Sequence, residues 1–112
     1  MSYKIIATSE FEKELKRLAR KYSSLPNDYN SFLVSLEENP QQGTSLGNSC
    51  YKIRLSISSK GRGKSGGARI ITYVFVKKET VYLLSIYDKS QKESMSNKEI
   101  NERLKYLKND KG

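Results

Sequence analysis

The run ARIITYVFV, residues 68–76, constrains the fold of this chain more than any other stretch. It is apolar at almost every position and rich in β-branched side chains, which favour strands. A strand without a polar face is covered by other elements on both sides. We therefore predict that residues 68–76 form the central strand of a sheet.

The segments on either side supply its neighbours. In CYKIRLSI, residues 50–57, apolar and polar side chains alternate with a period of two, which predicts a half-buried strand. Its polar face carries Lys52 and Arg54 side by side. After the central strand, KKET is typical of a turn, and VYLLSIY, residues 81–87, is predicted to complete a hairpin.

The N-terminal part of the chain follows the helical period instead. Ser9 and Glu12 have the spacing of a capping box and precede a predicted helix over residues 10–22. Pro26 suits the first turn of a second helix, which Asn39-Pro40 ends.

A short strand over residues 3–7 and a loop over residues 41–49 complete this part of the chain. Near the C-terminus, Ser96 and Glu99 form a second capping-box pattern before a last helix. The predicted order is β-α-α-β-β-β-α, an α+β fold with helices packed on one face of an antiparallel sheet. Its length suits a single domain over residues 1–112.

Positive charge is concentrated in the middle of the chain. Residues 39–78 contain no Asp or Glu, and their basic residues are Lys52, Arg54, Lys60, Arg62, Lys64, Arg69, Lys77 and Lys78. The rest of the chain carries 13 basic and 12 acidic residues, so nearly all of the net charge of +9 comes from residues 39–78. Such a field attracts polyanions, nucleic acid first. It does not indicate a membrane, because no apolar run approaches the roughly 18 residues of a span.

The residues that the chain lacks limit its chemistry. There is no histidine, and Cys50 is the single cysteine, so no internal disulfide forms and a reducing cytoplasm is expected. The N-terminal sequence MSYKIIATSEFEK lacks the apolar core of a signal peptide. Because residues 39–78 also lack carboxylates, we predict no metal site and no cofactor.

The segment KGRGKSGGAR, residues 60–69, raises the question of a phosphate site. It contains the Gly-Lys-Ser that ends a Walker A motif, but Ser58 stands where that motif needs a glycine. The pattern argues against nucleotide hydrolysis and leaves two interpretations open, a solvated basic loop and a loop that holds a phosphate. We expect Arg69 to emerge beside Lys52 and Arg54, where the three cations repel one another unless an anion joins them.

Three segments resemble toxins of the RelE/ParE superfamily from bacterial toxin–antitoxin modules. They are CYKIRL, GKSGGARIITYVF and VYLLSIYDKSQKESMSNKEI. The resemblance is greatest to the HigB-like branch, in which Lys-Ser-Gly-Gly-x-Arg precedes the central strand and Tyr-x-Lys ends the next one. It covers essentially the whole chain, and its motifs are most specific between Cys50 and Ile100. The predicted order of elements matches the fold of that superfamily.

The resemblance implies a ribosome-dependent endoribonuclease, an mRNA interferase that needs no metal. In such a reaction a 2′-hydroxyl attacks the adjacent phosphate and displaces the 5′-oxygen, which requires a base, an acid and stabilisation of added negative charge. A lysine among other cations can have a lowered pKa and act as a base. By resemblance, Lys52 is the general base, Arg54 and Arg69 contact the phosphate, and Lys89 protonates the leaving oxygen or binds phosphate.

Other residues are expected to contact the RNA. The position at which some relatives carry a catalytic tyrosine falls near Met95 here. Tyr87 is the candidate substitute, either by stacking on a base or by acid–base chemistry. The predicted RNA-binding residues are Lys60, Arg62, Lys64, Tyr87 and Lys92.

The resemblance also implies partners. They are a cognate antitoxin that covers the basic face, and the ribosome with its mRNA; operator DNA is contacted only through the antitoxin. An acidic antitoxin segment would complement the charge of this chain. Two alternatives stay open: a ParE-like inhibitor of DNA gyrase without nuclease activity, against which the basic cluster argues, and a non-catalytic RNA- or ribosome-binding module.

Overall fold

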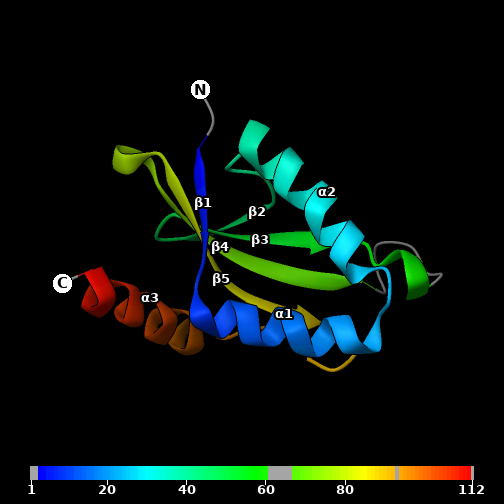
Figure 1. Cartoon of the computed structure of the whole chain (residues 1–112). Helices are drawn as coiled ribbons and strands as arrows, with labels where there is room; N and C mark the ends of the chain where they lie inside the picture. The colour runs from blue at the N-terminus through cyan, green and yellow to red at the C-terminus, as the bar shows by residue number, and fades with distance from the viewer. Residues whose placement is uncertain (1–2, 61–66, 93, 112) are drawn as a thin grey trace.

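A computed structural model describes residues 3–60, 67–92 and 94–111 (Figure 1). In chain order the elements are β1 (Lys4–Ala7), α1 (Ser9–Lys21), α2 (Leu25–Glu38), β2 (Thr44–Gly47), β3 (Cys50–Leu55), η1 (Ser58–Lys60), β4 (Ala68–Phe75), η3 (Val76–Lys78), β5 (Thr80–Asp88) and α3 (Asn97–Lys111). The three α-helices and five strands within these residues confirm the predicted α+β class. No helix in the described part of the chain is long and apolar enough to span a bilayer.

β4 is the central strand of the sheet, as its apolar sequence predicts. The strand order is β1-β5-β4-β3-β2, with β1 parallel to β5 and the other neighbours antiparallel. Leu55, Ala68 and Asp88 lie side by side where β3 ends, β4 begins and β5 ends. We call this the site end of the sheet.

β2 corrects the prediction of a loop over residues 41–49. Only Leu46 among its four residues is even partly buried, so the strand has no periodic apolar signal in the sequence. Its pairing is supplied by the edge of β3, and the turn between the two strands has positive φ at Asn48 and Ser49. A strand that depends on its neighbour in this way is visible only once the sheet has formed.

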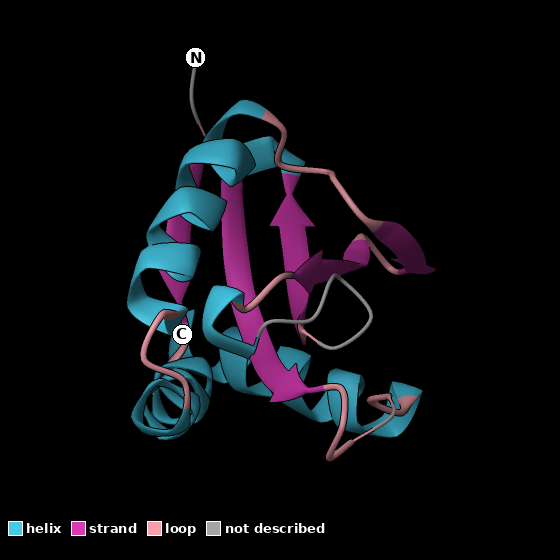
Figure 2. Cartoon of the chain, turned by 90° about the vertical axis from the view of Figure 1, so that its right-hand side faces the viewer, coloured by secondary structure: helices cyan, strands magenta, loops and turns pink. Residues whose placement is uncertain are grey.

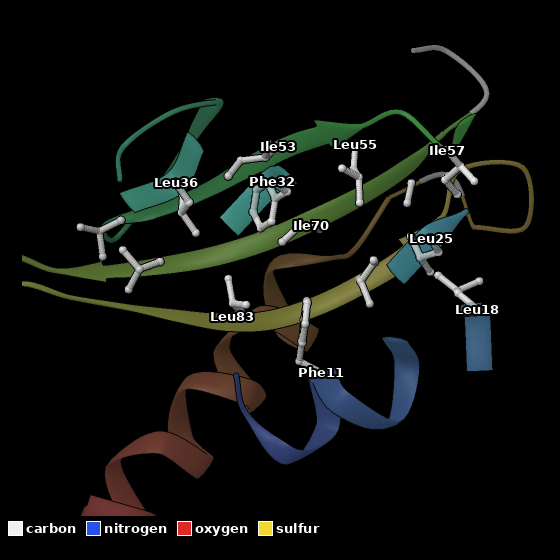
Figure 3. Close-up of a cluster of buried hydrophobic side chains, with 14 residues drawn as sticks. Phe11, Leu18, Leu25, Phe32, Leu36, Ile53, Leu55, Ile57, Ile70 and Leu83 are labelled. Atoms are coloured by element: carbon white, nitrogen blue, oxygen red, sulfur yellow. The ribbon is translucent and has the colours of Figure 1, made fainter. Parts of the chain in front are cut away.

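α1 and α2 cover one face of the sheet and close the main core. Their apolar residues repeat at helical spacing, which buries Phe11 of α1 and Leu36 of α2. Figure 3 shows these side chains gathered with Ile70 of β4 and Leu83 of β5. Each fully buried aliphatic side chain contributes roughly 1.5–3 kcal/mol of hydrophobic stabilisation. This face is therefore a major source of stability.

α3 covers the opposite face, which corrects the expectation that the helices pack on one face only. Ile100 of α3 is buried in a second cluster with Ile71 and Leu84, separate from the main core. The reason lies in β4, where Ile70 belongs to the main core and Ile71 to the second cluster. Apolar side chains on both faces of a strand require cover on both faces.

The two predicted capping boxes have different outcomes. At α3 the box is confirmed, because the Ser96 N–H donates to Glu99 (2.9 Å) and the Glu99 N–H donates to Ser96 Oγ (3.2 Å). At α1 the prediction that Ser9 caps the helix is wrong, because Thr8 occupies the cap position. The Thr8 hydroxyl accepts from a first-turn N–H (3.3 Å) and donates to the Leu83 carbonyl (2.8 Å), which ties the start of α1 to β5.

An ion pair between α1 and α3 binds the part of the β5 edge that β1 does not reach. β1 pairs with β5 only as far as residue 83, which leaves the next part of that edge without a strand partner. Glu14 of α1 accepts from the Ile86 N–H (3.2 Å), and Arg103 of α3 donates to the Leu84 carbonyl. The two side chains, each 19% exposed, form an ion pair of 2.8 Å. They satisfy free backbone groups of β5 and join α1 to α3.

Replacing Glu14 by Ala should destabilise the fold, because Arg103 loses its carboxylate partner and the Ile86 N–H loses its acceptor. We expect the free energy of unfolding to fall by about 3 kcal/mol. The matched control is Glu10→Ala in the same helix, which removes an exposed ion pair of 4.0 Å to Lys13 and should cost less than about 1 kcal/mol. Urea denaturation followed by circular dichroism measures both, and equal costs would contradict this role of Glu14.

Cys50 is expected to be unreactive in the folded protein. Its side chain is buried in the second cluster, and burial raises the pKa of the Cys50 thiol to about 11. Only the thiolate attacks disulfide reagents, and at pH 8 it amounts to roughly one part in a thousand. A chromogenic disulfide reagent should therefore detect no thiol until denaturant is added. Rapid reaction of the native protein would show that Cys50 is not packed as described.

Candidate functional site

The register of β3, β4 and β5 gathers the predicted site residues on one face of the sheet. Arg54 pairs with Arg69, and Arg69 pairs with Tyr87, so the three form a row across the strands. Paired residues point to the same face with Cβ atoms about 5 Å apart. Lys52 lies two residues before Arg54 on this face. We call Lys52, Arg54 and Arg69 the cation cluster.

The members of the cation cluster differ in exposure. Arg54 is exposed and Lys52 is half-buried, as expected for the polar face of β3. Arg69 is only 5% exposed, which corrects the prediction that its side chain emerges from the sheet, and its Nη1 donates to the Ala68 carbonyl (3.2 Å). Among the described residues, no carboxylate forms an ion pair with any of the three. Because burial limits its movement, Arg69 presents its charge from a fixed position.

Tyr87 lies beneath the surface at the end of the row. It is 7% exposed, and its hydroxyl has no hydrogen-bond partner of good geometry within the described parts of the chain. Burial raises the pKa of Tyr87, while Arg69 and the backbone of Met95 act to lower it. A base can stack only on an exposed ring, so the structure argues against Tyr87 as a stacking platform. The hydroxyl instead lies close to Met95, where the sequence lacks the tyrosine of some relatives.

Lys89 lies one residue beyond the end of β5 and still contacts the chain beside β4. Its N–H donates to the Gly67 carbonyl (3.2 Å), so the contact between β4 and β5 continues past the paired residues Ala68 and Asp88. Lys89 is half-buried and lies in the turn directly after β5, two residues beyond Tyr87, at the site end of the sheet. The structure thus brings Lys89 to the end of the row that Arg69 and Tyr87 form.

Lys92 has a different environment. Its Nζ lies 2.8 Å from a carboxylate oxygen of Glu99, the residue that also caps α3. The charge of Lys92 is therefore balanced within the protein, which weakens the case for Lys92 as an RNA contact. Sequence reasoning missed this pair because Lys92 lies seven residues before Glu99, outside the helix that would make their spacing informative.

Asp88 is a site-end residue that the sequence analysis also missed. Its side chain is buried, and its two oxygens accept hydrogen bonds from the Tyr22 hydroxyl (2.6 Å) and from the Ser90 N–H (3.0 Å) and Oγ (2.8 Å). An Asp at the end of a strand, two residues before a Ser, is a signal for such a turn. No sequence signal points to Tyr22, which is 66 residues away in the chain.

η1 precedes the segment of residues 61–66, and Gly67 with the start of β4 follows it, both at the site end of the sheet (Figure 2). Before it, the Ser58 N–H and Oγ of η1 donate to Asp28 of α2 at 2.9 Å and 2.8 Å. After it, Gly67 lies so close to β3 that a Cβ atom would be 2.2 Å from the Leu55 carbonyl oxygen, so no larger residue fits. Of the predicted RNA-binding residues, Lys60 is the last residue of η1, and the structure describes its backbone but not its side chain. Arg62 and Lys64 lie outside the described residues.

Comparison with known proteins gives consistent matches. The sequence model of the family described as RelE toxin of the RelE/RelB toxin-antitoxin system matches residues 4–110. A mutant of the E. coli toxin RelE in the free state is 24% identical with a TM-score of 0.61, over 83% of this chain and 90% of that one. A chain of the intact E. coli RelBE toxin-antitoxin complex is 24% identical (TM-score 0.61; 78% and 96% covered), and the isolated E. coli RelE toxin is 21% identical (0.60; 95% and 99%). These structures share the fold of this chain.

The cap of α3 should make stability depend on pH. The pKa of Glu99 is lowered from 4.5 to about 2, first by the hydrogen bond from Lys92 and then by the Ser96 N–H. A lowered carboxyl pKa stabilises the folded state above pH 4.5, and this contribution is lost as the pH falls towards 2. Thermal melts should show Glu99→Gln below wild type at pH 6 and the difference shrinking towards pH 2.

The control for this measurement is Glu102→Gln. Glu102 is exposed on the same helix, and its substitution makes the same change of charge. It should differ little from wild type at either pH. A difference between Glu99→Gln and wild type that persists unchanged at pH 2 would contradict the assignment.

Proposed function

Because this chain belongs to the RelE family, the toxins of RelE/RelB toxin–antitoxin systems, we propose that it cleaves translated messenger RNA on the ribosome. The observation that carries the proposal is the cation cluster on one face of the sheet, unpaired with carboxylates among the described residues. An RNA phosphate supplies the negative charge that three neighbouring cations lack. The cluster therefore suits an enzyme that binds and attacks a phosphodiester.

The proposed reaction is transfer of the phosphate to the neighbouring 2′-oxygen. Lys52, as general base, takes the proton of the 2′-hydroxyl, and that oxygen forms a bond to phosphorus while the bond from phosphorus to the 5′-oxygen breaks. Arg54 and Arg69 bind the phosphoryl oxygens, whose negative charge increases in the transition state. Lys89 gives a proton to the departing 5′-oxygen. The products are a 2′,3′-cyclic phosphate and a 5′-hydroxyl, and the scheme assigns no metal or cofactor.

The proposed partners follow from this reaction. The substrate is messenger RNA in the ribosome, so the site of action is the cytoplasm. One similar structure is a complex of the E. coli toxin with its antitoxin, and we propose a cognate antitoxin for this chain, with an acidic segment that covers the cation cluster. Contact with operator DNA is assigned to the antitoxin.

The test is induced expression of the wild type and single-residue variants, with primer extension across several cellular messages. Arg69→Ala and Lys52→Ala should each reduce cleavage by roughly 10²–10³-fold, since each removes a group that acts in the transition state. The matched control is Lys77→Ala, which removes one charge from the same acid-free segment. Lys77 is exposed in η3, beyond the end of β4 opposite the site end, so its variant should cleave as wild type does.

The possible outcomes separate the candidate functions. Cuts confined to translated regions and lost in Arg69→Ala would support the nuclease. Growth arrest with intact messages would overturn it and favour inhibition of DNA gyrase. Absence of toxicity together with retained ribosome binding would favour a non-catalytic binding module.

A further inference from the structure

We propose that Asp88 is a positioning residue that holds Lys89 against the scissile phosphate, an inference that rests on the proposed nuclease function. Asp88 ends β5 between the site residues Tyr87 and Lys89. Its carboxylate is 1% exposed and lies towards α1, away from the face of the cation cluster. It touches no predicted substrate position, so any effect on cleavage acts through its neighbours.

One oxygen of this carboxylate is bound to a rigid part of the fold. Oδ2 accepts a 2.6 Å hydrogen bond from the hydroxyl of Tyr22, the residue that follows α1, and Lys21 Nζ is 4.0 Å from the same oxygen. Lys21 also lies over the Tyr22 ring, 5.4 Å from its centroid. One turn earlier, Leu18 is buried in the main core, so this end of α1 cannot shift without disturbing the packing.

The other oxygen shapes the chain that follows the strand. Oδ1 of Asp88 accepts from the N–H (3.0 Å) and Oγ (2.8 Å) of Ser90. The backbone carbonyl of Asp88 accepts from the N–H groups of Gln91 and Lys92, each at 3.0 Å. Four hydrogen bonds to one residue thus reverse the chain immediately after Lys89.

Lys89 is therefore constrained on both sides of its own backbone. Its N–H donates to the Gly67 carbonyl, the preceding residue is anchored on α1, and the following residues form the turn. The hydrogen bond to Gly67 continues the pairing of β4 with β5 by one position, and from this continued register we infer that residue 89 shares the face of Tyr87 and Arg69. An acid is effective only within hydrogen-bond reach of the oxygen that it protonates. If the turn after Lys89 were less firmly held, cleavage would fall even though Lys89 is still present.

The test compares Asp88→Ala, Lys89→Ala and the double variant in cleavage of mRNA on purified programmed ribosomes. Lys89→Ala should lower kcat about 100-fold if Lys89 is the acid. Asp88→Ala should lower kcat at least tenfold with little change in KM, and adding it to Lys89→Ala should cause no further loss. Asp88→Asn keeps an oxygen for Ser90 and a polar group for Tyr22, so it should recover most of the activity.

Two further variants separate positioning from a general loss of stability. Tyr22→Phe removes the 2.6 Å hydrogen bond to Asp88 and keeps the packed ring, so it should fold and show part of the kcat defect. Thr8→Ala removes a hydrogen bond to the same strand, 2.8 Å to the Leu83 carbonyl, far from the site end. It should lower the melting temperature and leave kcat unchanged.

Each result decides a different claim. If the wild type does not cleave, the proposed function and this inference both fail. If the wild type cleaves and Asp88→Ala retains its kcat, or if the Asp88 and Lys89 effects multiply in the double variant, only the inference fails. Amide hydrogen exchange gives a readout independent of cleavage: Ser90, Gln91 and Lys92 should lose protection in Asp88→Ala, and unchanged protection would overturn the inference.

Discussion

Burial of β4 on both faces is the constraint on which the rest of the structure depends. Because Ile70 and Ile71 face opposite sides, the strand needs α1 and α2 on one side and α3 on the other. It also needs a hydrogen-bonded strand on each edge, which β3 and β5 provide. The row of Arg54, Arg69 and Tyr87 is a by-product of this arrangement, since its members are neighbours only while the three strands keep their register.

The elements with a periodic apolar pattern could be predicted from the sequence, and so could the cation cluster. Alternation along β3 is enough to place Lys52 and Arg54 on one face, and the run that follows identifies β4. β2 and the cap at Thr8 could not be predicted, because β2 owes its pairing to β3 and the cap owes part of its role to the Leu83 carbonyl. Such contacts join residues that are distant in sequence, and local patterns do not record them.

The sequence also did not predict how deeply individual charged side chains are buried. The strand pattern places Arg69 beside Arg54, but not the depth at which its guanidinium lies, since that depends on everything packed around it. Asp88 and Glu14 look like ordinary surface carboxylates in the sequence. Glu14 instead accepts from the Ile86 N–H of β5, and Asp88, at the end of β5, accepts from Ser90 in the turn that follows. Their other partners, Arg103 and Tyr22, come from distant parts of the chain.

The parallel pairing of β1 with β5 has a consequence for how the protein is made. β1 is synthesised before every other strand of the sheet, but its partners on β5, such as Thr80 for Lys4, follow 76 residues later. Contacts between such distant segments form late and slow the folding of small domains. A nascent chain therefore cannot close its sheet until β5 has left the exit tunnel. By then Lys52, Arg54 and Arg69 of β3 and β4 have already been synthesised, and Tyr87 completes their row only when β5 pairs with β4.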